Sequence, residues 1–117
     1  MRRSAGFLSL PLLVTASLAF ANPAGAAADY PTVAVADYVL GCLQTNGQTR
    51  HALEACSCSI DVIASILPYD RYERAETFKS MSLTIGERAG LFRESAPATA
   101  ARTELKRAQS EADVRCF

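Results

Sequence analysis

Four cysteines in a chain of 117 residues constrain this protein more than any other feature of its sequence. They are Cys42, Cys56, Cys58 and Cys116. A chain this short buries only a modest hydrophobic core, so covalent cross-links that restrict the unfolded chain contribute a large share of its stability. An even number of cysteines in a small exported domain typically forms a disulfide framework. We therefore expect two disulfides and a chain that reaches an oxidising compartment.

The first 28 residues have the order of regions found in a secretory signal peptide. A positive start (Met1-Arg2-Arg3) precedes an apolar run over residues 7–20, and small residues follow up to Ala28. The apolar run is shorter than the roughly 20 residues that a membrane-spanning helix needs. Cleavage after Ala28 or after Ala21 satisfies the small-x-small rule. The sequence thus predicts a single periplasmic or secreted domain, residues 29–117, with no membrane segment after cleavage.

The charge of this domain is nearly balanced. Residues 29–117 carry ten basic and twelve acidic side chains, a net charge of −2, without a long run of either sign. A nucleic-acid-binding domain would show a basic surplus gathered on one face. The charge pattern therefore excludes nucleic acid as an expected partner and is typical of a soluble exported domain.

Helical periodicity predicts an all-α fold, a small disulfide-stapled bundle of four to five short helices. The expected helices cover residues 32–45, 50–67, 70–81, 84–94 and 98–114. Gly47 ends the first helix, Thr49 caps the second, and Pro68 ends it. Asp70 and Thr84, each three residues before a glutamate, provide cap-like starts for the next two helices. Ser95 caps the last helix, with Pro97 in its first turn.

Helical phase favours one of the three possible disulfide pairings. A bond between Cys56 and Cys58 would close a strained ring across a single residue. Cys58 lies about 200° around the second helix from Cys56, because each residue turns the helix by about 100°. If the first two helices fold back on each other near Gly47, Cys42 comes closer to Cys56. We therefore favour Cys42–Cys56 with Cys58–Cys116, while Cys42–Cys58 with Cys56–Cys116 stays open.

The apolar stripes of the helices define the expected core. The second helix presents Leu53, Cys56, Ile60, Ile63 and Leu67 on one face, and the third presents Tyr72, Ala75, Phe78 and Met81. The last helix is rich in alanine, and its inner face consists of Ala101, Leu105, Ala108, Ala112 and Val114. This stripe is too thin to hold the helix by burial alone. We expect the Cys116 disulfide, backed by Phe117, to fasten its end to the core.

Five polar or aromatic residues are candidates for interactions. Asp61 lies in an otherwise apolar helix, where it is either exposed or bonded to Arg71 or Tyr72. Tyr69, Asp70, Arg71 and Tyr72 form the turn that follows Pro68. Together with Tyr30, the two tyrosines of this turn predict an apolar surface patch suited to a protein partner.

The Cys-x-Cys segment also admits two chemical interpretations. Cys56 and Cys58 could act as a thiol-redox pair, or with His51 and Met81 they could bind Cu(I) through soft ligands. Neither a Met- or His-rich tract nor a CxxC at a helix start accompanies them. His51 is the only histidine, so no nucleophile–base pair is evident. We therefore predict structural disulfides and no catalytic residue, metal or cofactor.

The string from Tyr38 to Tyr72, with its Cys…CxCxxD pattern, resembles a group of small exported proteobacterial proteins of unassigned function. The likeness covers residues 38–93, and it implies a helical hairpin built around these cysteines. The group is associated with periplasmic alcohol-oxidising and cytochrome systems and supplies no catalytic residues. In size and compartment the chain also resembles periplasmic acid-stress chaperones, which have one disulfide and different spacing.

These features together predict a small non-enzymatic helical protein that binds or steadies a protein partner in the periplasm. The alternative functions are a periplasmic thiol-redox or Cu(I)-handling protein that uses Cys56 and Cys58, and a stress-chaperone-like protein. The sequence does not identify the partner.

Overall fold

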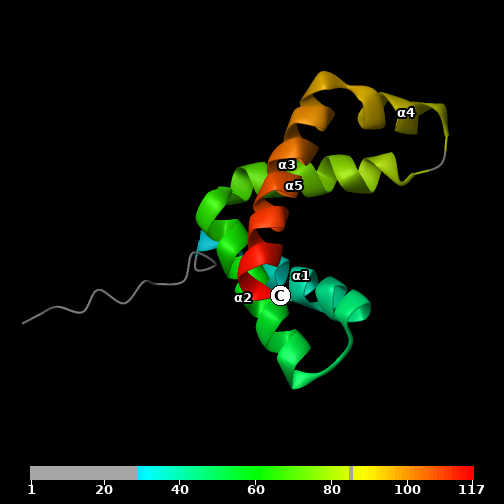
Figure 1. Ribbon diagram of the computed structural model, residues 1–117. Helices are drawn as coiled ribbons and strands as arrows, with labels where there is room; N and C mark the ends of the chain where they lie inside the picture. Colours follow the sequence, from blue (N-terminus) through cyan, green and yellow to red (C-terminus); the bar gives the residue numbers. More distant parts are fainter. Residues whose placement is uncertain (1–28, 85) are drawn as a thin grey trace, which may run out of the picture.

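The computed structural model describes residues 29–84 and 86–117, and every regular element in this part of the chain is an α-helix (Figure 1). The helices are α1 (Thr32–Asn46), α2 (Arg50–Ile66), α3 (Tyr69–Ser82), α4 (Glu87–Glu94) and α5 (Ala96–Cys116). The expected all-α, disulfide-stapled bundle is therefore confirmed. The predicted signal peptide lies outside the described residues.

The turns between the first three helices follow the expected local signals. Gly47 ends α1 with a left-handed φ of 90°, and its N–H donates to the carbonyl of Leu43. The hydroxyl oxygen of Thr49 accepts a hydrogen bond of 3.1 Å from the N–H of Ala52, which caps α2. Leu67 is extended because Pro68 disfavours the helical conformation in the residue before it.

The start of α5 is confirmed, whereas the two cap-like starts before it are wrong. Ser95 caps α5 through a 3.4 Å hydrogen bond from the N–H of Ala98. The Thr84 hydroxyl instead donates to the carbonyl of Met81, and α4 begins after Gly86, whose φ of 126° only glycine adopts readily. Asp70 lies inside the first turn of α3, because Pro68 precedes the helix and its carbonyl already accepts helical hydrogen bonds.

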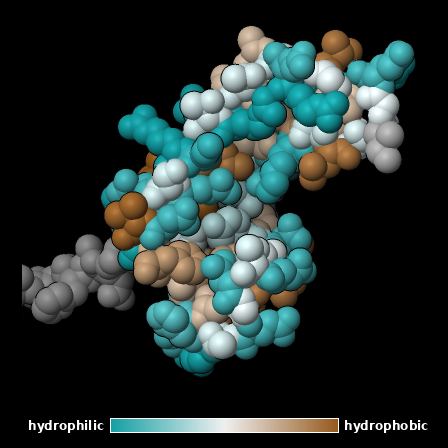
Figure 2. Space-filling model, turned by 45° about the vertical axis from the view of Figure 1, so that its right-hand side comes forward, coloured by the Kyte–Doolittle hydropathy of each residue, from teal (hydrophilic) through white to brown (hydrophobic). Residues whose placement is uncertain are grey.

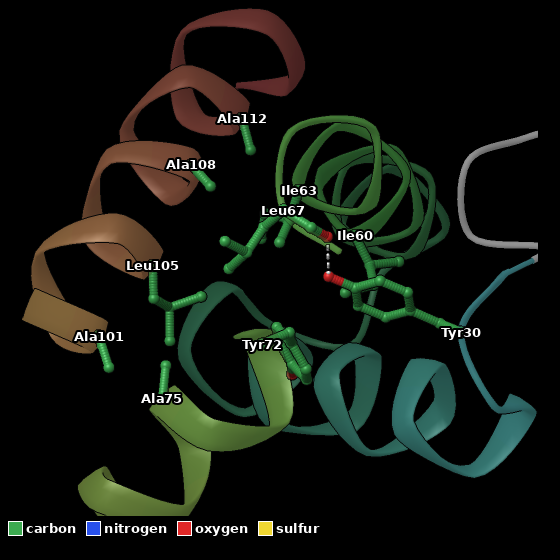
Figure 3. Close-up of a cluster of buried hydrophobic side chains, with 10 residues drawn as sticks. All are labelled: Tyr30, Ile60, Ile63, Leu67, Tyr72, Ala75, Ala101, Leu105, Ala108 and Ala112. Carbon is green, nitrogen blue, oxygen red and sulfur yellow. Dashed lines mark hydrogen bonds between the residues drawn. The ribbon is translucent and has the colours of Figure 1, made fainter. Parts of the chain in front are cut away.

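The core lies where α2, α3 and α5 meet (Figure 3). Ile63 of α2 and Leu67 at its end lie toward Leu105 and the alanines of α5, with Ala75 of α3 nearby, whereas Ile60 lies on the side of Tyr30. Alanine lets α5 approach α2 closely, because a methyl group occupies little space between two backbones. Tyr30, which precedes α1, closes the core by donating a 2.7 Å hydrogen bond from its hydroxyl to the carbonyl of Leu67.

Each expected stripe is confirmed over most of its length and wrong at one end. Leu53 at the start of α2 is 39% exposed, Met81 near the end of α3 is 38% exposed, and Val114 near the end of α5 is 85% exposed. Leu53 shares the face of its stripe but lies next to the turn between α1 and α2. Val114 lies about 200° around α5 from Ala112, because each residue turns the helix by about 100°, so it belongs to the outer face. Phe117 is 61% exposed as well, so it does not back the Cys116 disulfide as expected.

The favoured disulfide pairing is confirmed. Cys42 is bonded to Cys56 with a Cα–Cα distance of 5.9 Å, and Cys58 is bonded to Cys116 with a Cα–Cα distance of 5.8 Å. All four cysteines are thus used, and both bonds end on α2. One bond fastens α1 to α2, and the other fastens the C-terminal end of α5 to α2.

The opposite end of the molecule has no such bond. The described residues 81–84 and 86–95, here called the distal arm, contain α4, which packs on α3 and α5 at the end of the molecule away from α1 (Figure 1). Ala89 is the only buried residue among the eight residues of α4, all of which the structure describes. Arginine side chains join α4 to both neighbouring helices, since Arg93 donates to the carbonyl of Ser82 at the end of α3 and Arg102 of α5 donates to the carbonyl of Arg93.

Candidate partner-binding groove

The largest cavity described is an open groove of about 700 Å³ between α1, α3 and α5. Each helix contributes one continuous face to it. The α1 wall consists of Asp37, Tyr38, Gly41, Cys42, Thr45 and Asn46. The α3 wall consists of Tyr72, Glu76 and Lys79, and the α5 wall consists of Gln109, Asp113 and the adjoining Phe117. These spacings of three, four or eight residues place the side chains of each wall on one side of its helix.

The two disulfides position this groove. Cys42 lines it, and the bond from Cys42 to Cys56 fixes α1 against α2. The bond from Cys58 to Cys116 fixes the end of α5 on the same helix, directly before the groove residue Phe117. None of the fifteen residues of α1, a helix that the structure describes in full, is buried. Val35, Tyr38 and Val39 pack against the core while only partly buried, so the disulfide adds a covalent link to a limited hydrophobic contact.

Tyr38 anchors the deep side of the α1 wall. Its hydroxyl and the hydroxyl of Ser59, a buried residue of α2, lie 2.8 Å apart in a hydrogen bond. Burial raises the pKa of Tyr38, the hydrogen bond to Ser59 lowers it in part, and the charges of Asp113 and Glu76 raise it again. The phenol is therefore neutral at ordinary pH. Its hydroxyl is engaged with Ser59, and Tyr38 contributes an aromatic side chain to the lining of the groove.

The groove has a negative electrostatic character. Each of its three helical walls carries one carboxylate, namely Asp37, Glu76 and Asp113, and Lys79 is the cation among the lining residues. Lys79 lies 3.5 Å from Glu76. Burial raises the pKa of Tyr72 far above its usual value, and the charges of Glu76 and Asp37 raise it further. The pKa values of Tyr38 and Tyr72 are thus raised first by burial and further by the negative charges of carboxylates on neighbouring walls.

A second, smaller cavity lies near the turn between α1 and α2. It has a volume of about 320 Å³ and is lined by three leucines, Leu40, Leu43 and Leu53, and by four polar residues. Leu40 is 61% exposed. Hydrophobic side chains form separate small groups on the face shown in Figure 2, where hydrophilic residues predominate.

The five interaction candidates from the sequence do not form one site. Asp61, Asp70 and Arg71 are exposed, and Arg71 pairs with Glu104 of α5 at 3.3 Å. Tyr69 is half-buried and is not among the residues that line the large groove. Tyr72 alone reaches that groove, and its side chain also belongs to the core.

The expected surface patch of three tyrosines is wrong. Tyr30 and Tyr72 are buried, and their ring centroids lie 5.1 Å apart. The ring of Tyr69 packs edge-on against Tyr30 at 5.2 Å. Burial, together with the charge of Asp70, raises the pKa of Tyr30 to about 12. These rings close the core around the α2–α3 turn because tyrosine buries a large ring once its hydroxyl has a partner.

Sequence reasoning missed most residues of the groove. Asp37, Gly41, Glu76 and Asp113 lie on three different helices and share no motif. Only the tertiary arrangement brings them together. A glycine in the middle of the first predicted helix was the available signal, since glycine disfavours helix interiors.

The groove offers carboxylates, which can bind cations. It also offers phenol hydroxyls and amides, which donate and accept hydrogen bonds, and one ammonium group, which donates them. His51 is exposed at the start of α2, and it is not among the groove residues. Within residues 29–84 and 86–117, no three His, Cys, Asp or Glu side chains are grouped so that they could hold a metal ion.

In the same residues, no single helix has the length and hydropathy to cross a membrane; α2 and α3 reach both only as a pair bent by 113°. Comparison of the chain with protein-family models, curated proteins and solved structures gives no match. The resemblance to small exported proteins with a Cys…CxCxxD hairpin therefore stays a prediction, and arguments about function start from the groove.

Proposed function

We propose that this protein is a non-enzymatic helical module that binds a segment of a protein partner in the groove between α1, α3 and α5. The observation that carries the proposal is the construction of the groove. Two of its walls are the elements that the disulfides fasten to α2, and these walls carry exposed polar side chains around aromatic rings. A rigid, preorganised surface lowers the entropic cost of binding a partner.

The proposed location is the periplasm or another oxidising space outside the cytoplasm. Disulfides form and persist in such compartments and are rare in the cytosol. Two disulfides in a domain of this size are typical of an exported protein, and the signal-peptide-like composition of residues 1–28 supports the same location.

The state of the cysteines favours partner binding over thiol-redox or Cu(I) chemistry. Cys56 and Cys58 are bonded to different partners, so they do not form a single redox pair. Cys56 is fully buried, which blocks attack on its sulfur by an external thiolate. Thiol titration and disulfide mapping of the purified protein, with and without mild reductant, test this choice. Two resistant bonds support the proposal, and thiols released readily at Cys56 and Cys58 support the redox alternative.

The binding proposal is tested by site-specific photocrosslinking in living cells. A photoreactive amino acid replaces Thr45, an exposed residue of the groove, and in a matched variant it replaces Thr103, an exposed residue of α5 outside the groove. The proposal predicts an adduct of defined mass at position 45 that is absent at position 103. Equal labelling at both positions, or no adduct at position 45, would overturn it.

A further inference from the structure

We propose that the groove accepts a lysine- or arginine-bearing segment of the partner and that Gly41 keeps the α1 wall open for it. This inference rests on the proposed function and adds the chemical class of the bound segment. It is carried by the charge of the three walls and by an unexplained glycine in the middle of α1.

Gly41 has no role in the fold that would require a glycine. It lies inside α1, and the described glycines with positive φ are Gly47 and Gly86, so its backbone conformation suits any residue. A Cβ built on Gly41 meets no described atom within 4 Å, so close packing against another helix does not require its absence either. Glycine lowers the stability of a helix interior relative to alanine.

The absence of a side chain at Gly41 leaves space free in the groove. Gly41 lines it between Asp37 and Thr45, one helical turn from each, so any side chain at position 41 would project into the space above the α1 wall. Glycine at position 41 therefore lowers the stability of the helix and increases the space that the groove offers to a bound segment. This is the pattern expected of a residue that serves binding rather than folding.

The charges define the occupant. Three carboxylates on three walls surround a space that contains one lysine, which pairs with one of them. The charge left unmatched is negative, and the rings of Tyr38 and Phe117 are available to the body of a long side chain. Lysine and arginine combine a cationic head with an aliphatic stem, and such cations also bind the faces of aromatic rings.

The shape favours a peptide over a small polycation. From Asp37 to Asn46 the α1 wall extends about 14 Å, at about 1.5 Å per residue. An extended chain of about four residues has the same length, at about 3.3 Å per residue.

The test uses a capped tetralysine peptide, a capped tetraglutamate peptide and spermidine as probes of the oxidised protein, with binding followed by amide NMR shifts. We expect tetralysine to bind at low salt, to shift residues of the groove such as Gly41 and Gln109, and to weaken as salt is added. Tetraglutamate should not bind. Equal binding of both peptides would overturn the inference, as would the absence of tetralysine binding or tighter binding of spermidine.

Two pairs of variants separate binding from folding. Gly41→Ala should raise the Tm by about 2–8 °C. Its control is Gly90→Ala, at a glycine of α4 whose added Cβ also meets no described atom. This control should slow amide exchange in α4 and change the Tm little, because α4 contributes no residue to the main core cluster. Only substitution at position 41 should affect binding, and Gly41→Leu should lower tetralysine affinity at least about tenfold, as a few misplaced carbons do in a pocket. Unchanged affinity in Gly41→Leu contradicts the role of Gly41.

The second pair tests charge. Asp37→Asn should weaken tetralysine binding about two- to fivefold, the effect of one exposed ion pair. Asp61→Asn removes the same charge from an exposed position of α2 outside the groove and should leave affinity unchanged. Equal effects in both variants would show a non-specific response to net charge and overturn the inference. A crosslink at position 45 that maps to a partner segment without Lys or Arg would overturn this inference and leave the proposed function standing.

Discussion

Helices α1 and α4 contain almost no fully buried residue, although Val35, Tyr38 and Val39 of α1 pack partly buried against the core, and the molecule holds the two helices in different ways. None of the residues of α1 is buried, and α4 buries Ala89 alone, in helices that the structure describes completely. A disulfide and the Tyr38–Ser59 hydrogen bond fasten α1 to α2. By contrast, α4 is joined to its neighbours through exposed arginine hydrogen bonds.

The difference shows how a covalent bond can take the place of full burial in a small domain. The groove requires the α1 wall to stay in place, while the face of α1 that lines the groove remains available to a partner. Val35, Tyr38 and Val39 give α1 only a partly buried contact with the core. The disulfide adds to this contact, whereas α4, which lines no part of the large groove, has no such bond.

The largest expected effect is the loss of the Cys58–Cys116 bond. This bond closes a loop with a sequence separation of 58 residues. Replacing both cysteines with alanine should lower the free energy of unfolding by about 4 kcal/mol, because the cross-link restricts a long stretch of the unfolded chain. Urea unfolding followed by circular dichroism measures this loss. A loss below about 1 kcal/mol would show that the thin alanine face of α5 suffices to hold it.

Loss of the Cys42–Cys56 bond should cost less overall but act more locally. The sequence separation is 14 residues, so the double alanine variant should lose about 3 kcal/mol. We also expect α1 to detach from α2 in this variant while the core of α2, α3 and α5 persists. Amide NMR spectra would then show α1 exchanging with solvent. If α1 stays as ordered as α2 in this variant, the disulfide is not what holds α1 in place, and the proposed difference between α1 and α4 is wrong.

Replacing Tyr30 with phenylalanine tests the core that both regions share. The variant loses the buried hydrogen bond to the Leu67 carbonyl and should be about 1 kcal/mol less stable. Since burial raises the folded-state pKa of Tyr30 to about 12, above its usual value of 10, the folded protein binds the proton more tightly than the unfolded chain. This contribution to stability is complete below pH 10 and is lost as the pH rises toward 12.

Urea unfolding measured at several alkaline pH values tests the sign of this effect. Wild-type stability should fall between pH 10 and 12, and the fall should be shallower in Tyr30→Phe. Tyr72, whose pKa burial also raises, keeps part of the slope in the variant. Identical slopes in both proteins would contradict the buried, hydrogen-bonded state of Tyr30.

The smallest effect is expected in the distal arm. Arg93→Ala removes the hydrogen bond to the Ser82 carbonyl, an exposed contact, and should change the global free energy of unfolding by about 0.5 kcal/mol or less. Faster amide exchange should be confined to α4 and the end of α3. A global loss as large as that of a disulfide variant would show that the arm is part of the main cooperative unit.

The sequence predicted the elements and the disulfides well because these depend on local rules. Gly47, Thr49 and Ser95 act within one turn of their own positions. The phase of Cys56 relative to Cys58, together with the expected hairpin at Gly47, favoured the pairing that the structure has.

What the sequence did not predict depends on where helices cross. Leu53 has the phase of its stripe but lies near the α1–α2 turn, where it lines the smaller cavity with Leu40 and Leu43. Val114 lies about 200° around α5 from Ala112, which places it on the outer face. Tyr72 was expected both in the core and in a surface patch, and the structure places it in the core beside Tyr30. The groove is of the same kind, since Asp37, Glu76 and Asp113 come together only after α1 is fastened to α2. Periodicity gives the face of a residue but not its neighbour across space.

Hydrogen exchange of the oxidised protein and of the same protein after reduction and alkylation tests the central claim most directly. The account predicts strong protection of α1 and of the last turns of α5 in the oxidised protein, with weaker protection of α4. After reduction, the protection of α1 should fall to the level of α4 or below. If α1 keeps its protection without the Cys42–Cys56 bond, or if α4 is protected as strongly as α1 before reduction, the disulfides do not replace burial in this fold.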